Sequence, residues 1–439
     1  MHTSIDHPHA QELEYISAIL ESHPIIDELA LQDLSAEVMF ANCGAQGMSA
    51  EQVVRSAVIK QMNQFSYDRL AFHLADSRCY RKFCKIGIAD KTFGSSTLCD
   101  NIKALSAETW QQINRILMDY AQDEKIEKGR KSRFDCSVVQ TNIHKPFDST
   151  LLWDAVRVLT RLLKNTALEF SNATIVYTDH SRRAKRRMLG ILNAKSEKQR
   201  TSFYKDLLKV TQKTVNYAQS AMVALKKHPL AQQNRMAAVR ALGHYVDLAG
   251  KVIDQTQRRV LHGESVPSSE KIVSIFEPHT DIIVKDNRDT LYGHKICIAG
   301  GGSGLITDCI IVEGNPADTT LTEQMLDRQH QIYGRYPLKV AFDGGFASKQ
   351  NLKAAKQKQI KDVCFGKKRG LNVEDMCRSD WVFKQLRRFR AGIESAISWI
   401  KRCFGLCRCT WKGDRSFKSY VWSAIVSANL LTIARKQLA

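Results

Sequence analysis

Val340-Ala341-Phe342-Asp343-Gly344-Gly345 is an apolar run that stops at an aspartate and two glycines. Short apolar runs bounded by turn residues are typical of buried strands. A second run of the same character, Phe134-Asp135-Cys136-Ser137, lies far upstream. The pattern therefore predicts two buried strands, each carrying one aspartate.

A third carboxylate lies on a basic helix. Arg390-Ala391-Gly392-Ile393-Glu394 is followed seven residues later by Lys401, and ten Lys and Arg stand against two acids in residues 384–418. At about 100° per residue, Arg390 lies roughly 40° and Lys401 roughly 20° from Glu394, so the three share one face. An ion-pairing role for Glu394 explains this spacing equally well. The upstream aspartates favour a metal site, because three carboxylates are hard oxygen ligands suited to paired magnesium ions acting on phosphodiesters.

Composition indicates a basic, globular chain. It has 439 residues, which suggests two or three domains, and a formal net charge of +20. This surplus favours a polyanionic partner such as nucleic acid, with a ribosomal or membrane-surface protein as the alternative. The 44% hydrophobic content excludes a disordered basic tail as its source. Twelve scattered cysteines fit buried reduced thiols in the cytoplasm, and apolar residues 421–434 are too few to span a bilayer.

Residues 1–125 are expected to form an N-terminal helical domain. Ser49-Ala50-Glu51-Gln52 is a capping box at the start of one helix, and Ser66 begins another. Short helices with interspersed Arg and Lys are typical of a helix-turn-helix arrangement that binds DNA. A helical cap or a dimerisation domain remains the alternative.

Residues 149–265 are expected to form a helical insertion after a strand at 131–139. The insertion contains Arg182-Arg183-Ala184-Lys185-Arg186-Arg187, which has five cations in six positions. A solvated helix face is the usual explanation of such a run. We expect phosphate contacts from Arg182, Arg183, Arg186 and Arg187.

After Pro267 the pattern alternates between strands and helices. Segments 292–299 and 305–312 are predicted to form a hairpin, followed by a helix at 320–334 and a strand at 339–342. A helix at 348–358, a strand at 363–365 and the basic helix complete the order. This connectivity predicts an α/β fold with a ribonuclease-H-like core, a mixed five-stranded sheet with helices, formed by residues 131–148 and 266–439. Asp343 then ends the fourth strand, beside the strand of Asp135.

These motifs resemble those of bacterial insertion-sequence transposases of the DDE type, in the ISNCY-like group. The resemblance covers most of the chain, including the segments around Asp135, Asp343 and Glu394. Many such enzymes carry a Tyr-Arg-Glu-Lys signature with two, three and six intervening residues. This sequence matches at Arg390, Glu394 and Lys401, whereas Arg387 occupies the position of the tyrosine.

The resemblance implies a DNA transposase that cleaves element ends and joins them to target DNA. Asp135, Asp343 and Glu394 would be catalytic and would hold two Mg²⁺ ions, for which Mn²⁺ can substitute. Arg390 and Lys401, with Arg387 and Arg388, would contact DNA phosphates. The implied partner is double-stranded DNA, bound by a homodimer in the bacterial cytoplasm at the nucleoid, with no membrane association.

Other residues give competing interpretations. Glu277 and Asp281 form a rival carboxylate pair, ranked lower because they precede the hairpin. His144 is predicted to be structural rather than part of the site. Two other functions also stay open, namely a structure-specific nuclease on the same core and a non-catalytic DNA-binding protein derived from a transposase.

Overall fold

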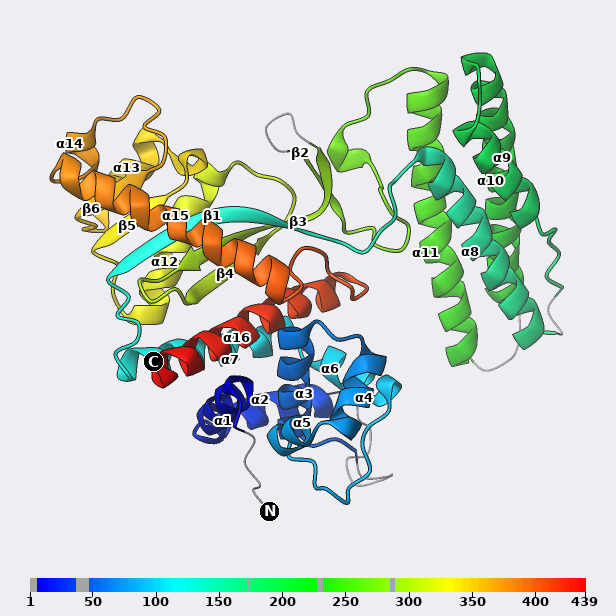
Figure 1. Cartoon of the computed structure of the whole chain (residues 1–439). Coiled ribbons are helices and arrows are strands. Elements are labelled where there is room, and N and C mark those ends of the chain that lie inside the picture. The colour runs from blue at the N-terminus through cyan, green and yellow to red at the C-terminus, as the bar shows by residue number, and fades with distance from the viewer. Residues whose placement is uncertain (1–5, 37–46, 172–173, 227–231, 285–288) are drawn as a thin grey trace. The chain divides into compact units, whose positions relative to one another are not determined.

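The computed structural model describes residues 6–36, 47–171, 174–226, 232–284 and 289–439. The chain divides into two compact units: residues 1–141 with 294–439 form the first, and residues 142–293 form the second. The fold is mixed α/β, with a mixed sheet and many helices (Figure 1).

Short helices form the N-terminal part of the first unit. The predicted capping box is present, because the Ser49 hydroxyl accepts from the Gln52 amide at 3.2 Å and the Gln52 side chain accepts from the Ser49 amide at 3.1 Å. The Ser66 hydroxyl caps the next helix by accepting from the Arg69 amide at 3.2 Å. The helices of this part are α1 (Pro8–Glu21), α2 (Ile25–Ser35), α3 (Ala50–Asn63), α4 (Tyr67–Asp76), α5 (Arg78–Phe83), α6 (Ser95–Ala104) and α7 (Ala107–Asp123).

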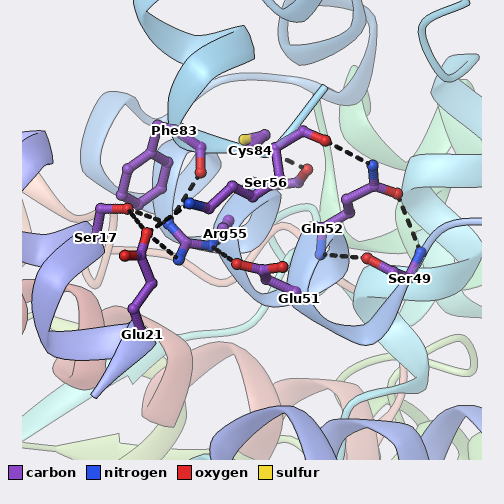
Figure 2. Close-up of polar contacts among 10 residues, drawn as sticks. Ser17, Glu21, Ser49, Glu51, Gln52, Arg55, Ser56, Phe83 and Cys84 are labelled. Atoms are coloured by element: carbon purple, nitrogen blue, oxygen red, sulfur yellow. Dashed lines mark hydrogen bonds and ion pairs between the residues drawn. The ribbon is translucent and has the colours of Figure 1, made fainter. Parts of the chain in front are cut away.

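A buried arginine ties three of these helices together (Figure 2). Arg55 of α3 donates to the Ser17 hydroxyl of α1 at 2.7 Å and to the Phe83 carbonyl of α5 at 3.0 Å. It also pairs with Glu51 at 3.0 Å and Glu21 at 3.4 Å. These contacts satisfy the guanidinium, whose side chain is only 1% exposed.

Parallel strands form one side of the sheet and an antiparallel hairpin lies on the other. β1 (Lys131–Gln140) pairs in parallel with β5 (Lys339–Phe342), and β5 pairs in parallel with β6 (Asp362–Phe365). On the other side of β1 lies β3 (Thr290–Gly300), which pairs antiparallel with β4 (Ile306–Val312). The predicted hairpin and the neighbouring positions of β1 and β5 are therefore confirmed.

One strand was not predicted. β2 (Asp281–Val284) pairs antiparallel with residues 290–293, the first residues of β3. Within the described residues the sheet has six strands, so the prediction of five was wrong. A four-residue strand is too short for a visible period-two pattern, and its pairing partner stabilises it.

Helices between and after the strands complete the first unit. They are α12 (Thr322–Tyr333), α13 (Lys349–Gln357), α14 (Val373–Met376), α15 (Asp380–Cys403) and α16 (Asp414–Leu438). α15 packs across β1, β5 and β6, and α16 packs against α7, α3 and α1 (Figure 1). The continuous burial of residues 419–431 explains the apolar character of α16. Within the described ranges, no helix has the length and apolar character needed to cross a membrane.

The second unit is mainly helical. Its apolar residues form a core of their own, to which all four α-helices contribute. A π-helical turn at Gln257–Leu261 follows the last helix. The helices are α8 (Asp148–Glu169), α9 (Ser181–Leu192), α10 (Glu197–Lys226) and α11 (Gln232–Thr256).

Candidate active site

Asp135 and Asp343 lie at the same level of two neighbouring parallel strands. The register pairs Phe134 with Phe342, and an aspartate follows each of them, Asp135 within β1 and Asp343 directly after the end of β5. The two phenylalanine rings are fully buried and stack with centroids 4.5 Å apart. Because side chains alternate between the faces of a sheet, Asp135 lies on the opposite face of β1 from the Phe134 ring.

α15 brings Glu394 and Arg390 to the aspartates. The Arg390 Nη1 atom lies 2.6 Å from Asp343 Oδ1 and 3.8 Å from Asp135 Oδ2. Its Nη2 atom donates to Glu394 Oε1. One guanidinium thus contacts all three carboxylates predicted from the sequence.

This cluster carries more negative than positive charge. Counted over these four side chains alone, three carboxylates and one guanidinium give a net charge of minus two. The side chains of Asp343 and Glu394 are 43% and 57% exposed, so the cluster is open to solvent. Carboxylate oxygens are hard ligands, and those of Asp135, Asp343 and Glu394 already gather around one cation, the Arg390 guanidinium. The same three carboxylates form a suitable ligand set for divalent metal ions.

A close contact that we did not predict fixes α15 on β1. Arg133 donates to the Phe389 carbonyl at 3.0 Å and lies 4.9 Å from the Phe389 ring centroid. A Cβ atom at Gly392 would lie 1.9 Å from Arg133 Nη1, so only glycine fits there without a shift. Glycine within a helix costs about 1 kcal/mol relative to alanine, so a glycine there usually has a packing reason. Gly392 was therefore the sequence signal for this close contact.

The other basic residues predicted on α15 lie in different settings. Arg387 and Arg388 are exposed. Lys401 lines a cavity formed with residues of α3, α4 and the loop after α15, and the residues lining that cavity include none of the three carboxylates. Arg390 is therefore the predicted cation that the structure brings to Asp135, Asp343 and Glu394.

The basic run on α9 divides into two kinds of residue. Arg183 and Arg187 both pair with Asp206 of α10, Arg187 at 2.5 Å. Arg182 and Arg186 are exposed, and within the described part of the chain neither makes an ion pair. Packing between α9 and α10 thus uses half of the arginines that we expected to contact phosphate.

The rival residues lie in the second unit and have local partners. His144 Nε2 lies 2.8 Å from Oδ2 of the buried Asp154, and this hydrogen bond raises the pKa of His144. Glu277 is buried and lies 2.8 Å from His279 Nε2. Asp281 begins β2. These contacts give His144 and Glu277 structural roles.

Two protein-family models match parts of the chain. Residues 271–430 match the transposase DDE domain, and residues 3–104 match a transposase domain known as DUF772. Asp343 and Glu394 lie inside the first match, whereas Asp135 lies outside both. Comparisons with curated proteins and with solved structures find no match. The two domain matches identify the chain as a member of the insertion-sequence DDE transposases, a family that acts on DNA and uses divalent metal ions.

Proposed function

We propose that this protein binds the ends of an insertion sequence, cleaves them and joins them to target DNA by metal-dependent phosphoryl transfer. The observation that carries the proposal is the meeting of Asp135, Asp343 and Glu394 at the Arg390 guanidinium. These residues come from two strands and one helix that lie far apart in the sequence. Their surplus of negative charge suits cation binding better than a purely structural ion pair.

The proposed cofactor is a pair of Mg²⁺ ions, for which Mn²⁺ can substitute. Asp135, Asp343 and Glu394 would hold these ions through their carboxylate oxygens. Such ions, when bound, activate a water or a DNA 3′-hydroxyl and stabilise the leaving oxygen of an in-line displacement.

Basic residues of the chain would position the DNA. Arg390 presents a planar fork that can hold a phosphate by two hydrogen bonds, and it offsets carboxylate charge that would otherwise repel the DNA. Lys401 would act as a point charge for a flanking phosphate, and Arg387 and Arg388 would contact the backbone from the exposed face of α15.

The second unit would contribute further DNA contacts through α9. Arg182 and Arg186 are exposed and suited to phosphates. Arg183 and Arg187 would have to share their charge between DNA and Asp206. The two pairs therefore differ in what they can contribute to DNA binding.

The strand order supports a ribonuclease-H-like core. Without β2, the order β4-β3-β1-β5-β6 is that of a mixed five-stranded sheet in which the strands of Asp135 and Asp343 are neighbours. We assign this core to residues 131–148 and 266–439, with 149–265 as the helical insertion. Residues 1–125 would bind DNA, and two copies of the chain would act on the two double-stranded ends of the element.

The test compares Asp343→Asn and Glu394→Gln with Glu374→Gln, an exposed carboxylate of α14. The substrate is duplex DNA that carries the sequences flanking the coding region, incubated with Mg²⁺. The cleavage rate of the first two variants should fall by more than about a hundredfold. Removing a direct metal ligand should lower the rate at least as much as removing a residue that only orients a ligand. They should still bind DNA in a mobility-shift assay, and Glu374→Gln should behave as wild type.

The alternatives predict different results in the same assay. Cleavage without joining of 3′-ends to a target plasmid would indicate a structure-specific nuclease. DNA binding by the wild type without any cleavage would indicate a non-catalytic DNA-binding protein. Loss of both binding and cleavage in Asp343→Asn would indicate a folding defect.

A further inference from the structure

A basic cavity of about 680 Å³ lies between the N-terminal helices and the loop that follows α15, within the first unit. Hydrogen bonds fix its walls. The Gln64 side chain donates to the Arg402 carbonyl at 2.6 Å, and the Gln61 side chain donates to the Phe404 carbonyl at 3.4 Å. The Tyr420 hydroxyl donates to the Gly405 carbonyl at 3.0 Å. The cavity is therefore a built feature of the fold.

The charge of this cavity has one sign. None of the described residues that line it is acidic, whereas the basic ones are Lys60, Lys103, Lys401, Arg402 and Arg408. A lining with several cations and no acidic residue attracts an anion. The lining thus indicates a negatively charged ligand.

Lys60 is the most unusual member of the lining. It is 5% exposed, and within the described residues its ammonium has no carboxylate and no hydrogen-bond acceptor. The ammonium lies 4.9 Å from the Tyr67 ring centroid and 5.6 Å from that of Trp411. Burial lowers the pKa of Lys60 to about 8. The two aromatic faces offset part of the stabilisation that the Lys60 ammonium loses when it is removed from water. A bound anion would offset the remaining part.

Trp411 gives a second, independent indication. Its indole Nε1 is buried and, among the described residues, has no hydrogen-bond partner. Buried donors are normally satisfied, so one in the wall of a cavity points to an acceptor that enters the cavity. An oxyanion would accept from such a donor as well as from Lys60.

The position of the cavity along α15 suggests which anion it receives. Lys401 lies seven residues beyond Glu394 on the same helix, which is about 10 Å of helix rise. A DNA strand advances about 3.4 Å per nucleotide, so a strand that starts at the carboxylates would reach the cavity after about three nucleotides. A backbone phosphate is thus an anion that would arrive there with the substrate.

We propose that this cavity binds a backbone phosphate of the DNA strand being processed, with Lys60 as the central cation and Lys103, Lys401 and Trp411 beside it. The inference rests on the proposed function, because it takes the strand to lie at Asp135, Asp343 and Glu394. It assigns the N-terminal helices a contact close to the reacting phosphate, in addition to any role in recognising element ends.

The test measures the salt dependence of duplex DNA binding for Lys60→Met. A lost phosphate contact should flatten the log–log slope by about one unit. Thermal stability should stay the same or rise, because the substitution removes a buried charge without a carboxylate partner. Lys91→Met, which removes an exposed lysine outside the cavity, should leave both properties nearly unchanged.

Further variants keep the proposal falsifiable. Lys60→Arg preserves the charge and should retain most of the binding, whereas Lys103→Met should flatten the slope if Lys60→Met does not fold. An unchanged slope in both Lys60→Met and Lys103→Met would overturn the proposal. Stabilisation of the wild type by inorganic phosphate, lost in Lys60→Met while the DNA slope is unchanged, would instead indicate a small-anion site. Asp343→Asn should keep the wild-type slope, so failure of the catalytic assignment and failure of this inference give different results.

Discussion

Arg55 and Arg390 each pair with more than one carboxylate, and they do so in opposite ways. Arg55 lies within the N-terminal helices, where its partners include a hydroxyl and a carbonyl as well as Glu21 and Glu51 (Figure 2). Lys85 also pairs with Glu21 at 2.5 Å, so two cations balance two anions. We call this the closed cluster, because its guanidinium is buried and its charges balance.

The cluster around Arg390 is open and unbalanced. Asp135, Asp343 and Glu394 share one guanidinium, and two of the three carboxylates are about half exposed. An arginine that pairs with several carboxylates is therefore not by itself a sign of function. Net charge separates the two clusters, whereas both contain partly exposed carboxylates. A balanced cluster holds elements together, and a surplus of carboxylates can accept a cation.

The largest expected effect is on stability at the closed cluster. Arg55→Leu should lower the free energy of unfolding by about 3 kcal/mol, because it breaks a buried network that joins three helices. Arg390→Gln should change it by less than about 1 kcal/mol, because its carboxylates can be hydrated in its absence. Urea unfolding of both variants measures the contrast. Equal losses in the two variants would remove the distinction between the clusters.

The next effect is on activity at the open cluster. Arg390→Lys keeps the charge but removes the planar fork, so strand joining should fall on the order of a hundredfold if the fork positions a phosphate. Stability should remain within about 1 kcal/mol of wild type. Arg130→Lys, an exposed arginine beside β1, serves as the matched control. Full strand joining by Arg390→Lys would reduce Arg390 to a charge-balancing residue.

A smaller effect is expected where α15 approaches β1. Gly→Ala within a helix normally gains about 1 kcal/mol, but Gly392→Ala must move Arg133 away from the Phe389 carbonyl and lose a hydrogen bond worth about 1 kcal/mol. The single variant should therefore show almost no gain in stability. In an Arg133→Met background the same change should gain close to its full amount. A double-mutant cycle measures this coupling, and additive effects would show that the contact is loose.

Much of the site was predictable because its signals are local. Apolar runs that end in Asp135 and Asp343 mark strands, and the order of the elements makes those strands neighbours. Helical spacing placed Arg390 and Glu394 on one face, four residues apart. These inferences need only the period of the chain and its connectivity.

The remaining features depend on how elements pack. The sequence did not predict that Asp343 contacts Arg390, or that Asp206 of α10 contacts Arg183 and Arg187. Such ion pairs form between elements whose mutual rotation no periodicity specifies. β2 escaped prediction for a related reason, because a short strand is stabilised by its partner strand.

The smallest expected effect returns to the closed cluster and tests whether its charge balance contributes to stability. Hydrogen bonds from Lys85 and then Ser17 lower the pKa of Glu21 below its usual 4.5. A carboxylate with a lowered folded-state pKa stabilises the fold above its unfolded pKa, and this contribution is lost as the pH falls through the folded-state value. Because Glu21 is about half exposed, the contribution should be 0–1 kcal/mol.

Urea unfolding of wild type and Glu21→Gln between pH 7 and pH 3 measures this contribution. The variant should be slightly less stable than wild type at pH 6 to 7, and the difference should shrink below about pH 4.5 as Glu21 of the wild type becomes protonated. Glu28→Gln, an exposed glutamate at the start of α2, provides the same change of charge outside the cluster. A difference that stays constant across this pH range would mean that Glu21 acts through packing and neutral hydrogen bonds. The closed cluster would then owe its stability to the burial of Arg55 and its hydroxyl and carbonyl partners, and charge balance would no longer distinguish it from the cluster at Arg390.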